Sequence, residues 1–220
     1  MALQLAVRVE RTDPPNADGA AVACALATIA LLDDDRSGPE GPWHDAVERW
    51  NGAKIRKIVR RGRASGWRRA EEAEGVTVEV DGVQARAFVP GPIDRVPAPV
   101  AKLQIQASPL EESEPVAELP AEVLDPDRPG LLVVVTPEVE MSWGKRAAQC
   151  AHATHRAWMR ADPARRQAWT EAGRPLTVLR VTPALWLRLV DDADVTIRDG
   201  GFTEIPAGTM TTAARWIVPG

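Results

Sequence analysis

Four polar side chains recur at helical spacing within residues 141–158, and their types are the ones most able to do chemistry. Lys145, Gln149, His152 and Arg156 fall in one stripe roughly 60° wide on a helix that turns about 100° per residue. Small and apolar residues cover the opposite side. A lysine opposes the macrodipole in a first helical turn, which prefers acids. We therefore expect Lys145 to serve a function other than helix stability.

Two neighbouring segments must position this stripe. The β-branched and leucine-rich run 131–136 predicts a buried strand directly before it, and Ser142 is a suitable N-cap for a helix over 144–160. Near the end of the chain, Asp199 stands where a predicted strand over 194–198 gives way to two glycines. Thr203 and Thr209 place hydroxyls in the same glycine-containing segment.

These two segments resemble the signatures of a known family, the type 2 peptidyl-tRNA hydrolases of archaea and eukaryotes. The first is Met-x-x-Gly-Lys-x-Ala-Ala-Gln-Cys-x-His-Ala over 141–153. The second is Asp-Gly-Gly-Phe-Thr-Glu-Ile-Pro-Ala-Gly-Thr over 199–209. Both occur in the family's order after a valine-rich strand, and the resemblance covers 130–220. It implies a small α/β/α domain that commonly pairs as a homodimer.

The resemblance also implies a reaction, the hydrolysis of the ester that joins a peptide to the 3′ end of tRNA. The residues expected to act in catalysis are Lys145, Asp199, Gln149 and Thr209. Those expected to bind the substrate are Thr203, His152, Gly144 and Trp143. Lys145 would supply a cation for a phosphate or an oxyanion. The expected partner is tRNA, and neither a metal nor an organic cofactor is implied.

Each of these residues also has an ordinary structural interpretation. Lys145 would then be a solvated lysine, Asp199 a turn residue bonded to its own backbone, and His152 a packed helical histidine. Cys150 falls on the packed face of the helix, where a small core residue is expected rather than a nucleophile. Trp143 would either stack on a base of the tRNA or close the start of the helix.

The chain departs from the family pattern at the second signature. Phe202 stands where an arginine is frequent, and residues 206–208 shuffle the usual Pro-Gly order. These departures leave open a non-catalytic pseudoenzyme of the same fold that binds tRNA or another partner. A hydrolase acting on a different acyl-tRNA is a second alternative.

Composition limits the class of protein. The chain has 220 residues, two cysteines and a net charge of −4. Two cysteines without a spaced Cys/His set predict neither a disulfide framework nor a zinc site. No apolar run is long enough for a transmembrane helix, and residues 1–10 lack the basic start of a signal peptide, so we expect a cytoplasmic protein. Seven acids and one base lie in 107–129, which predicts an acidic Pro/Glu-rich linker.

The sequence on either side of this linker predicts two similar units. Before it, strands are expected over 3–9, 55–59, 76–80, 85–89 and 100–106, with helices over 19–32, 43–50 and 64–72. After it, helices are expected over 164–172 and 183–191, and strands over 176–181 and 210–218 besides those described above. A shift of 126 residues superimposes the apolar pattern of the first predicted helix on that of 144–160.

The comparison of the halves predicts which one is active. Lys145 aligns with Gly19, Gln149 with Ala23, and His152 with Leu26; the Gly208–Thr209 pair aligns with Gly91–Pro92. We therefore expect an α/β fold of two three-layer α/β/α units with small mixed sheets, joined as an intrachain pseudodimer in a monomer. Residues 1–106 would be a degenerate copy, 107–129 a linker, and 130–220 the catalytic domain.

A basic run in the first half offers a second function. Residues 54–69 hold eight cations and no acid, and we expect Arg60, Arg61 and Arg63 to bind phosphates of tRNA. The alternative is a solvated face that balances the acidic linker.

Overall fold

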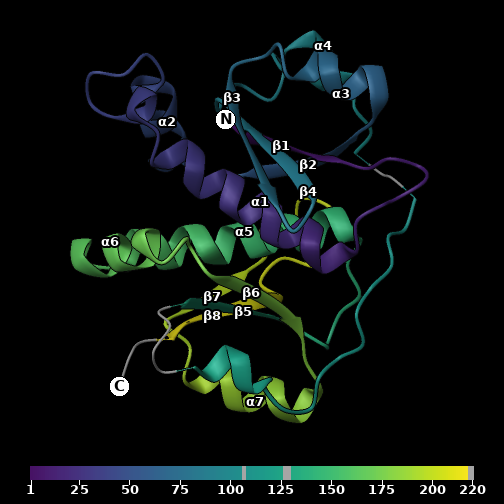
Figure 1. Ribbon diagram of the computed structural model, residues 1–220, viewed down its shortest axis with the longest axis vertical. Coiled ribbons are helices and arrows are strands. Elements are labelled where there is room, and N and C mark those ends of the chain that lie inside the picture. The colour runs from purple at the N-terminus through teal and green to yellow at the C-terminus, as the bar shows by residue number, and fades with distance from the viewer. Residues whose placement is uncertain (106–107, 126–129, 218–220) are drawn as a thin grey trace.

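The computed structural model describes residues 1–105, 108–125 and 130–217 and shows two four-stranded sheets stacked with helices between and outside them (Figure 1). The long helices α1 (Ala17–Leu32) and α5 (Trp143–Arg160) pack against each other in the middle layer. The outer layers are α3 (Ala64–Ala70) with α4 (Ala98–Ala101) at one end and α7 (Pro183–Asp191) at the other.

The N-terminal sheet has the strand order β2-β1-β4-β3. Its strands are β1 (Leu3–Arg8), β2 (Lys57–Gly62), β3 (Gly75–Val80) and β4 (Val83–Phe88). Strand β1 pairs parallel with β2, and the other two pairings are antiparallel. The helix α2 (His44–Asn51) and a 3-10 turn, η1 (Asp35–Ser37), connect α1 to β2.

The C-terminal sheet repeats this arrangement with the order β6-β5-β8-β7. Its strands are β5 (Gly130–Val135), β6 (Leu176–Arg180), β7 (Val195–Arg198) and β8 (Met210–Ile217), with α6 (Pro163–Glu171) between α5 and β6. Again only the β5–β6 pairing is parallel. The prediction of an α/β fold with two similar units and small mixed sheets is therefore confirmed.

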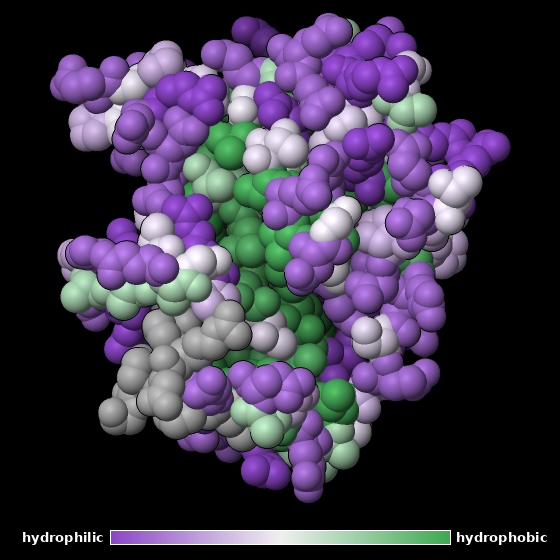
Figure 2. All heavy atoms as spheres, in the orientation of Figure 1, coloured by the Kyte–Doolittle hydropathy of each residue, from purple (hydrophilic) through white to green (hydrophobic). Residues whose placement is uncertain are grey.

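The two units share one hydrophobic core. It joins residues of β1 and α1 with residues of β5 and α5, and smaller clusters lie beneath α3 and α4 and beneath α7. Helix α1 is buried on almost every side, which explains why its sequence is apolar nearly all round. Figure 2 shows hydrophobic side chains gathered across the middle of one face, at the level of these two helices. Removing either unit would expose this layer to water.

The acidic segment between the units is fastened to both of them, and its Glu111 carbonyl accepts the backbone N–H of Ala17 at 2.8 Å. Glu112 accepts a hydrogen bond from Arg146 at 2.5 Å and forms an ion pair with Arg180 at 3.0 Å. The backbone of Val116 pairs with Val181, and a 3-10 turn, η2 (Ala121–Leu124), follows. The described part of this segment is therefore anchored rather than free.

Three details differ from the sequence predictions. Residues 98–101 form the short helix α4 where a strand over 100–106 was expected, and of that range Gln104 alone among the described residues makes a β-bridge, to Arg61. Pro99 near the helix start fits this outcome, because a proline there gives up no helical hydrogen bond. Residue 106 lies outside the described residues. Strand β2 begins at Lys57, after the positive φ of 44° at Ile55.

The third difference concerns the equivalence of the two halves. Strands β4 and β8 occupy the same place in their sheets, so the two-residue turn between β3 and β4 corresponds to the whole segment 199–209 between β7 and β8. The alignment of Gly208–Thr209 with Gly91–Pro92 was therefore wrong. The glycine-containing segment is an enlarged hairpin connection.

Candidate active site

The first turn of α5 is tied to the loop between β7 and β8. Ser142 caps the helix, and its hydroxyl accepts a hydrogen bond from the backbone N–H of Lys145 at 3.3 Å. The Glu204 carboxylate accepts from the Ser142 backbone N–H at 2.9 Å and from its hydroxyl at 2.6 Å. The negative charge of Glu204 interacts favourably with the positive end of the helix macrodipole. This offsets the unfavourable interaction of the Lys145 charge with the same helix end.

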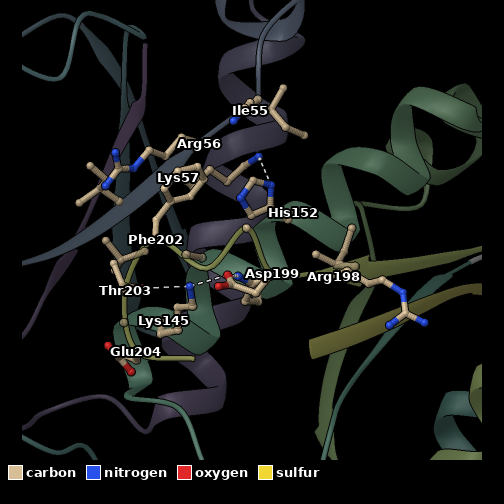
Figure 3. A pocket seen from close by; sticks show the side chains of 18 of the residues that line it. Ile55, Arg56, Lys57, Lys145, His152, Arg198, Asp199, Phe202, Thr203 and Glu204 are labelled. Atoms are coloured by element: carbon tan, nitrogen blue, oxygen red, sulfur yellow. Dashed lines mark hydrogen bonds and ion pairs between the residues drawn. The ribbon is translucent and has the colours of Figure 1, made fainter. Parts of the chain in front are cut away.

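Lys145 and Asp199 form the centre of the site (Figure 3). The Lys145 Nζ lies 2.5 Å from Asp199 Oδ1 and donates a second hydrogen bond to the Thr203 hydroxyl at 3.0 Å. The two charged side chains are only 11% and 4% exposed, so their attraction is weakly screened by water. Two of the three N–H groups of the Lys145 ammonium thus have partners among the described residues. The third N–H can donate to an oxygen of a bound molecule.

Gln149 extends this network by one helical turn. Its Nε2 donates to Asp199 Oδ1 at 2.8 Å, and its Oε1 accepts from the Thr211 hydroxyl at 2.8 Å. The amide is therefore held at both ends. Thr211 was missed by sequence reasoning, because no local pattern marks its contact with Gln149.

The Asp199 carboxylate accepts three hydrogen bonds from the described residues. Its Oδ2 accepts the backbone N–H of Gly201 at 2.8 Å, in addition to the two side-chain donors on Oδ1. Gly201 has a φ of +73°, and a Cβ there would lie 2.6 Å from Ala207, so only glycine fits. Thr209 acts through its backbone: its carbonyl accepts the Asp199 N–H at 2.8 Å. This loop holds the carboxylate toward Lys145.

A cavity of about 720 Å³ opens over these residues and has walls from both units. The C-terminal wall includes Lys145, Gln149, His152 and Asp199, and the N-terminal wall is the segment 54–59 with Ile105. Seven of the lining side chains are cationic and two are acidic. The cations are Lys54, Arg56, Lys57, Lys145, Arg156, Arg160 and Arg198. With Lys145 and Asp199 neutralising each other, six basic side chains remain against Glu204, so the cavity favours an anion.

The loop residue Phe202 joins the two walls. Phe202 is 55% exposed, and its ring lies over Gly200, where a Cβ would come within 2.6 Å of the ring. Lys54 Nζ and Arg56 Cζ lie 5.3 and 5.4 Å from the ring centre. Phe202, which stands where the resemblance leads one to expect an arginine, thus meets two cations from the other unit.

The remaining predicted residues divide between the cavity and the core. Gly144 and His152 line the cavity. Trp143 is only 4% exposed and donates through its indole N–H to the Ser108 carbonyl, so it packs in the core and is not presented for stacking on a base. Cys150 is fully buried, and burial raises the pKa of its thiol to about 12, which fits the expected packing role.

The basic run also divides. Arg60 is buried; it donates to the Gln4 side chain and to the carbonyls of Ala101 and Leu103. Its guanidinium therefore holds α4 to the sheet and is not free for phosphates. Arg61 and Arg63 line a separate recess beside Glu10. The cations that reach the main cavity are those at the start of the run, which sequence reasoning did not single out.

Two general features complete the description. None of the helices in the described parts of the chain has the length and hydrophobicity needed to span a bilayer. The described residues contain no cluster of three or more His, Cys, Asp or Glu side chains placed to hold a metal ion.

The fold and cavity define an α/β protein with an anion-attracting site beside the first turn of a helix. Residues 130–219 match the family model described as peptidyl-tRNA hydrolase PTH2. Over 87 residues the chain is 31% identical to the peptidyl-tRNA hydrolase of Methanothermobacter thermautotrophicus, an alignment covering 36% of this chain and 78% of that protein. The chain therefore belongs to the peptidyl-tRNA hydrolase PTH2 family, and its match lies in the C-terminal unit.

Proposed function

We propose that this protein is a peptidyl-tRNA hydrolase, which cleaves the ester between a peptide and the 3′ end of tRNA. The observation that carries the proposal is the Lys145–Asp199 pair, which lies in the part of the chain that matches the family and faces a cationic cavity. A nucleic-acid end brings phosphates, and the excess of cations suits them. The non-catalytic alternative gains no support from the family matches.

The residues of the site have distinct roles in this proposal. Water adds to the ester carbonyl, and the resulting tetrahedral oxyanion takes the third N–H of Lys145. Asp199 fixes the position of Lys145, and Thr203 directs it from the other side. Gln149, held by Thr211, keeps the carboxylate in place. As the bond to the ribose oxygen breaks, that oxygen takes up the proton that the water gave up, which releases the peptide acid and the free tRNA.

The N-terminal unit has a supporting role in this proposal. We propose that residues 1–106 are a degenerate copy of the catalytic domain 130–220, a view that the repeated strand order supports. Leu26 and Ala23 stand where the second copy has His152 and Gln149, so the first copy lacks the polar stripe. It keeps a cationic wall that faces the substrate cavity.

The test is release of an N-acetylated amino acid from charged tRNA by the full chain. We expect turnover by the wild type and little by Lys145→Ala, with the unblocked aminoacyl-tRNA cleaved much more slowly. Binding of tRNA without turnover would favour the pseudoenzyme. Equal cleavage of blocked and unblocked substrates would favour a different acyl-tRNA hydrolase.

A further inference from the structure

A buried lysine of the N-terminal unit lies against the histidines of α5. Lys57 is 6% exposed, and its Nζ lies 3.4 Å from His152 Nδ1 and 3.2 Å from His155 Nδ1. The same nitrogen lies 4.7 Å from the centre of the Trp50 ring, which stacks on His155 at 5.1 Å. Among the described residues no carboxylate pairs with this amine. Figure 3 shows the contact between Lys57 and His152 at the cavity.

The chemistry of the amine limits the direction of these hydrogen bonds. An ammonium has three N–H groups and no lone pair, so it donates to both imidazoles and directs its third N–H at the face of Trp50. A neutral amine still has two N–H groups but a single lone pair, so it too can donate to both rings but accept from only one. The arrangement that uses both contacts in either state makes each Nδ1 an acceptor.

An imidazole that accepts at Nδ1 and stays neutral carries its proton on Nε2. His152 lines the cavity, and its Nε2 has no partner among the described residues. We propose that Lys57 is a positioning residue of the active site: it holds His152 as the Nε2–H tautomer, so that the imidazole presents a hydrogen-bond donor to an oxygen of the substrate. His155, which is fully buried, serves as the second anchor of the lysine.

The surroundings of Lys57 argue against a role in stability. Burial without an acid disfavours its charge and holds the pKa of the amine well below its usual value, with Arg156 adding to the effect. A methionine of similar length would fill the same space without that penalty. A lysine that costs stability and contacts a cavity histidine is best explained by what it does to that histidine.

The first experiment reads the tautomer directly and does not depend on the proposed function. The chain has three histidines, so long-range ¹⁵N–¹H spectra of the imidazoles are assignable with His44→Gln and His155→Gln. We expect Nε2–H for His152 in the wild type and a mixture of tautomers in Lys57→Met, whose unfolding midpoint should be equal or higher. Nδ1–H in the wild type, or an unchanged spectrum in Lys57→Met, would overturn the proposal.

The second experiment rests on the proposed function and measures hydrolysis. Lys57→Met should lower kcat/KM roughly tenfold, as expected for loss of one oriented donor. Lys102→Met, an exposed lysine of the same unit, is the matched control. Gln at position 152 offers an N–H near the Nε2 position without needing Lys57, so Lys57→Met should have no further effect in His152→Gln. An undiminished loss in that background would refute the positioning role, whereas absence of wild-type turnover would refute only the proposed function.

Discussion

The two units have the same strand order but differ in what surrounds the turn after the third strand. In the N-terminal unit Asp81–Gly82 closes a tight hairpin, and the neighbouring helix α1 is apolar apart from Asp18 and Thr28. In the C-terminal unit the same connection is enlarged to residues 199–209, and α5 presents Lys145 and Gln149 to it. The comparison shows that the same arrangement of strands and helices gains a candidate active site when one loop is longer and the neighbouring helix has a polar face.

The difference between the two units is tested most directly by substituting the two aspartates that follow β3 and β7. Asp199→Asn removes the charge that holds Lys145, and we expect a loss of kcat of about 100-fold or more. Asp81→Asn is the matched change in the other unit and should leave kcat unaltered, since Asn tolerates the positive φ of 49° at that turn. Rates of release of N-acetylated amino acid measure both. Equal effects would remove the distinction between the units.

The buried arginine of β2 tests whether the basic run is partly structural. Arg60→Ala leaves Gln4 and two carbonyls without their donor, so we expect unfolding to become easier by about 2–3 kcal/mol. Urea unfolding measures the change, and Arg69→Ala on the exposed face of α3 is the control. An unchanged stability together with a raised KM would return Arg60 to the role of a phosphate-binding residue.

The cavity wall of the N-terminal unit is tested by Lys54→Ala with Arg56→Ala. Losing two cations should raise KM about tenfold. It should also reduce the magnitude of the slope of log kcat/KM against log salt concentration by about one to two. The pair Arg68→Ala with Arg69→Ala removes the same charge from the same unit, but outside the cavity. If both double variants gave the same salt dependence, the wall would have no special role.

The two histidines of α5 should make the stability of the folded chain sensitive to acid, whereas the equivalent positions of α1 should not. Burial, followed by Lys57, holds the pKa of both His152 and His155 well below the usual 6.5. The unfolded chain then binds protons that the folded chain does not, so stability falls as pH drops below about 6.5, by up to about 1.4 kcal/mol per unit for each histidine. The equivalent positions in α1 are Leu26 and Ile29, which do not titrate.

His155→Phe checks this, because it keeps a ring beside Trp50 and removes one titrating group. Its free energy of unfolding, measured in urea at pH 7.5 and pH 5.5, should depend less on pH than that of the wild type. An identical pH dependence would place the acid sensitivity elsewhere in the chain.

Much of the fold could be predicted because it depends on local patterns. The hairpin around Asp81–Gly82 and the two long helices carry strong periodic and turn signals, and the structure confirms them. The helix at 98–101 was missed because four residues are too few to show a period. The placing of Lys145 beside Asp199 followed from the resemblance rather than from any rule of spacing.

The contribution of Lys57 could not be predicted in the same way. Its contact with α5 depends on how two sheets stack on one helical layer, which no local pattern encodes. The sequence shows only a basic run, in which buried and cavity-facing cations look alike. Thr211 was missed for a related reason: its partner Gln149 lies 62 residues away in the chain.

The two units that pack together through α1 and α5 belong to one chain, and this determines what happens to the cavity when the protein is diluted. When two walls of a site come from separate molecules, the fraction of complete sites falls as the protein is diluted. Here both walls belong to one chain, so the effective concentration of one for the other is set by the covalent connection. The complete cavity should therefore persist at any dilution at which the chain itself stays folded.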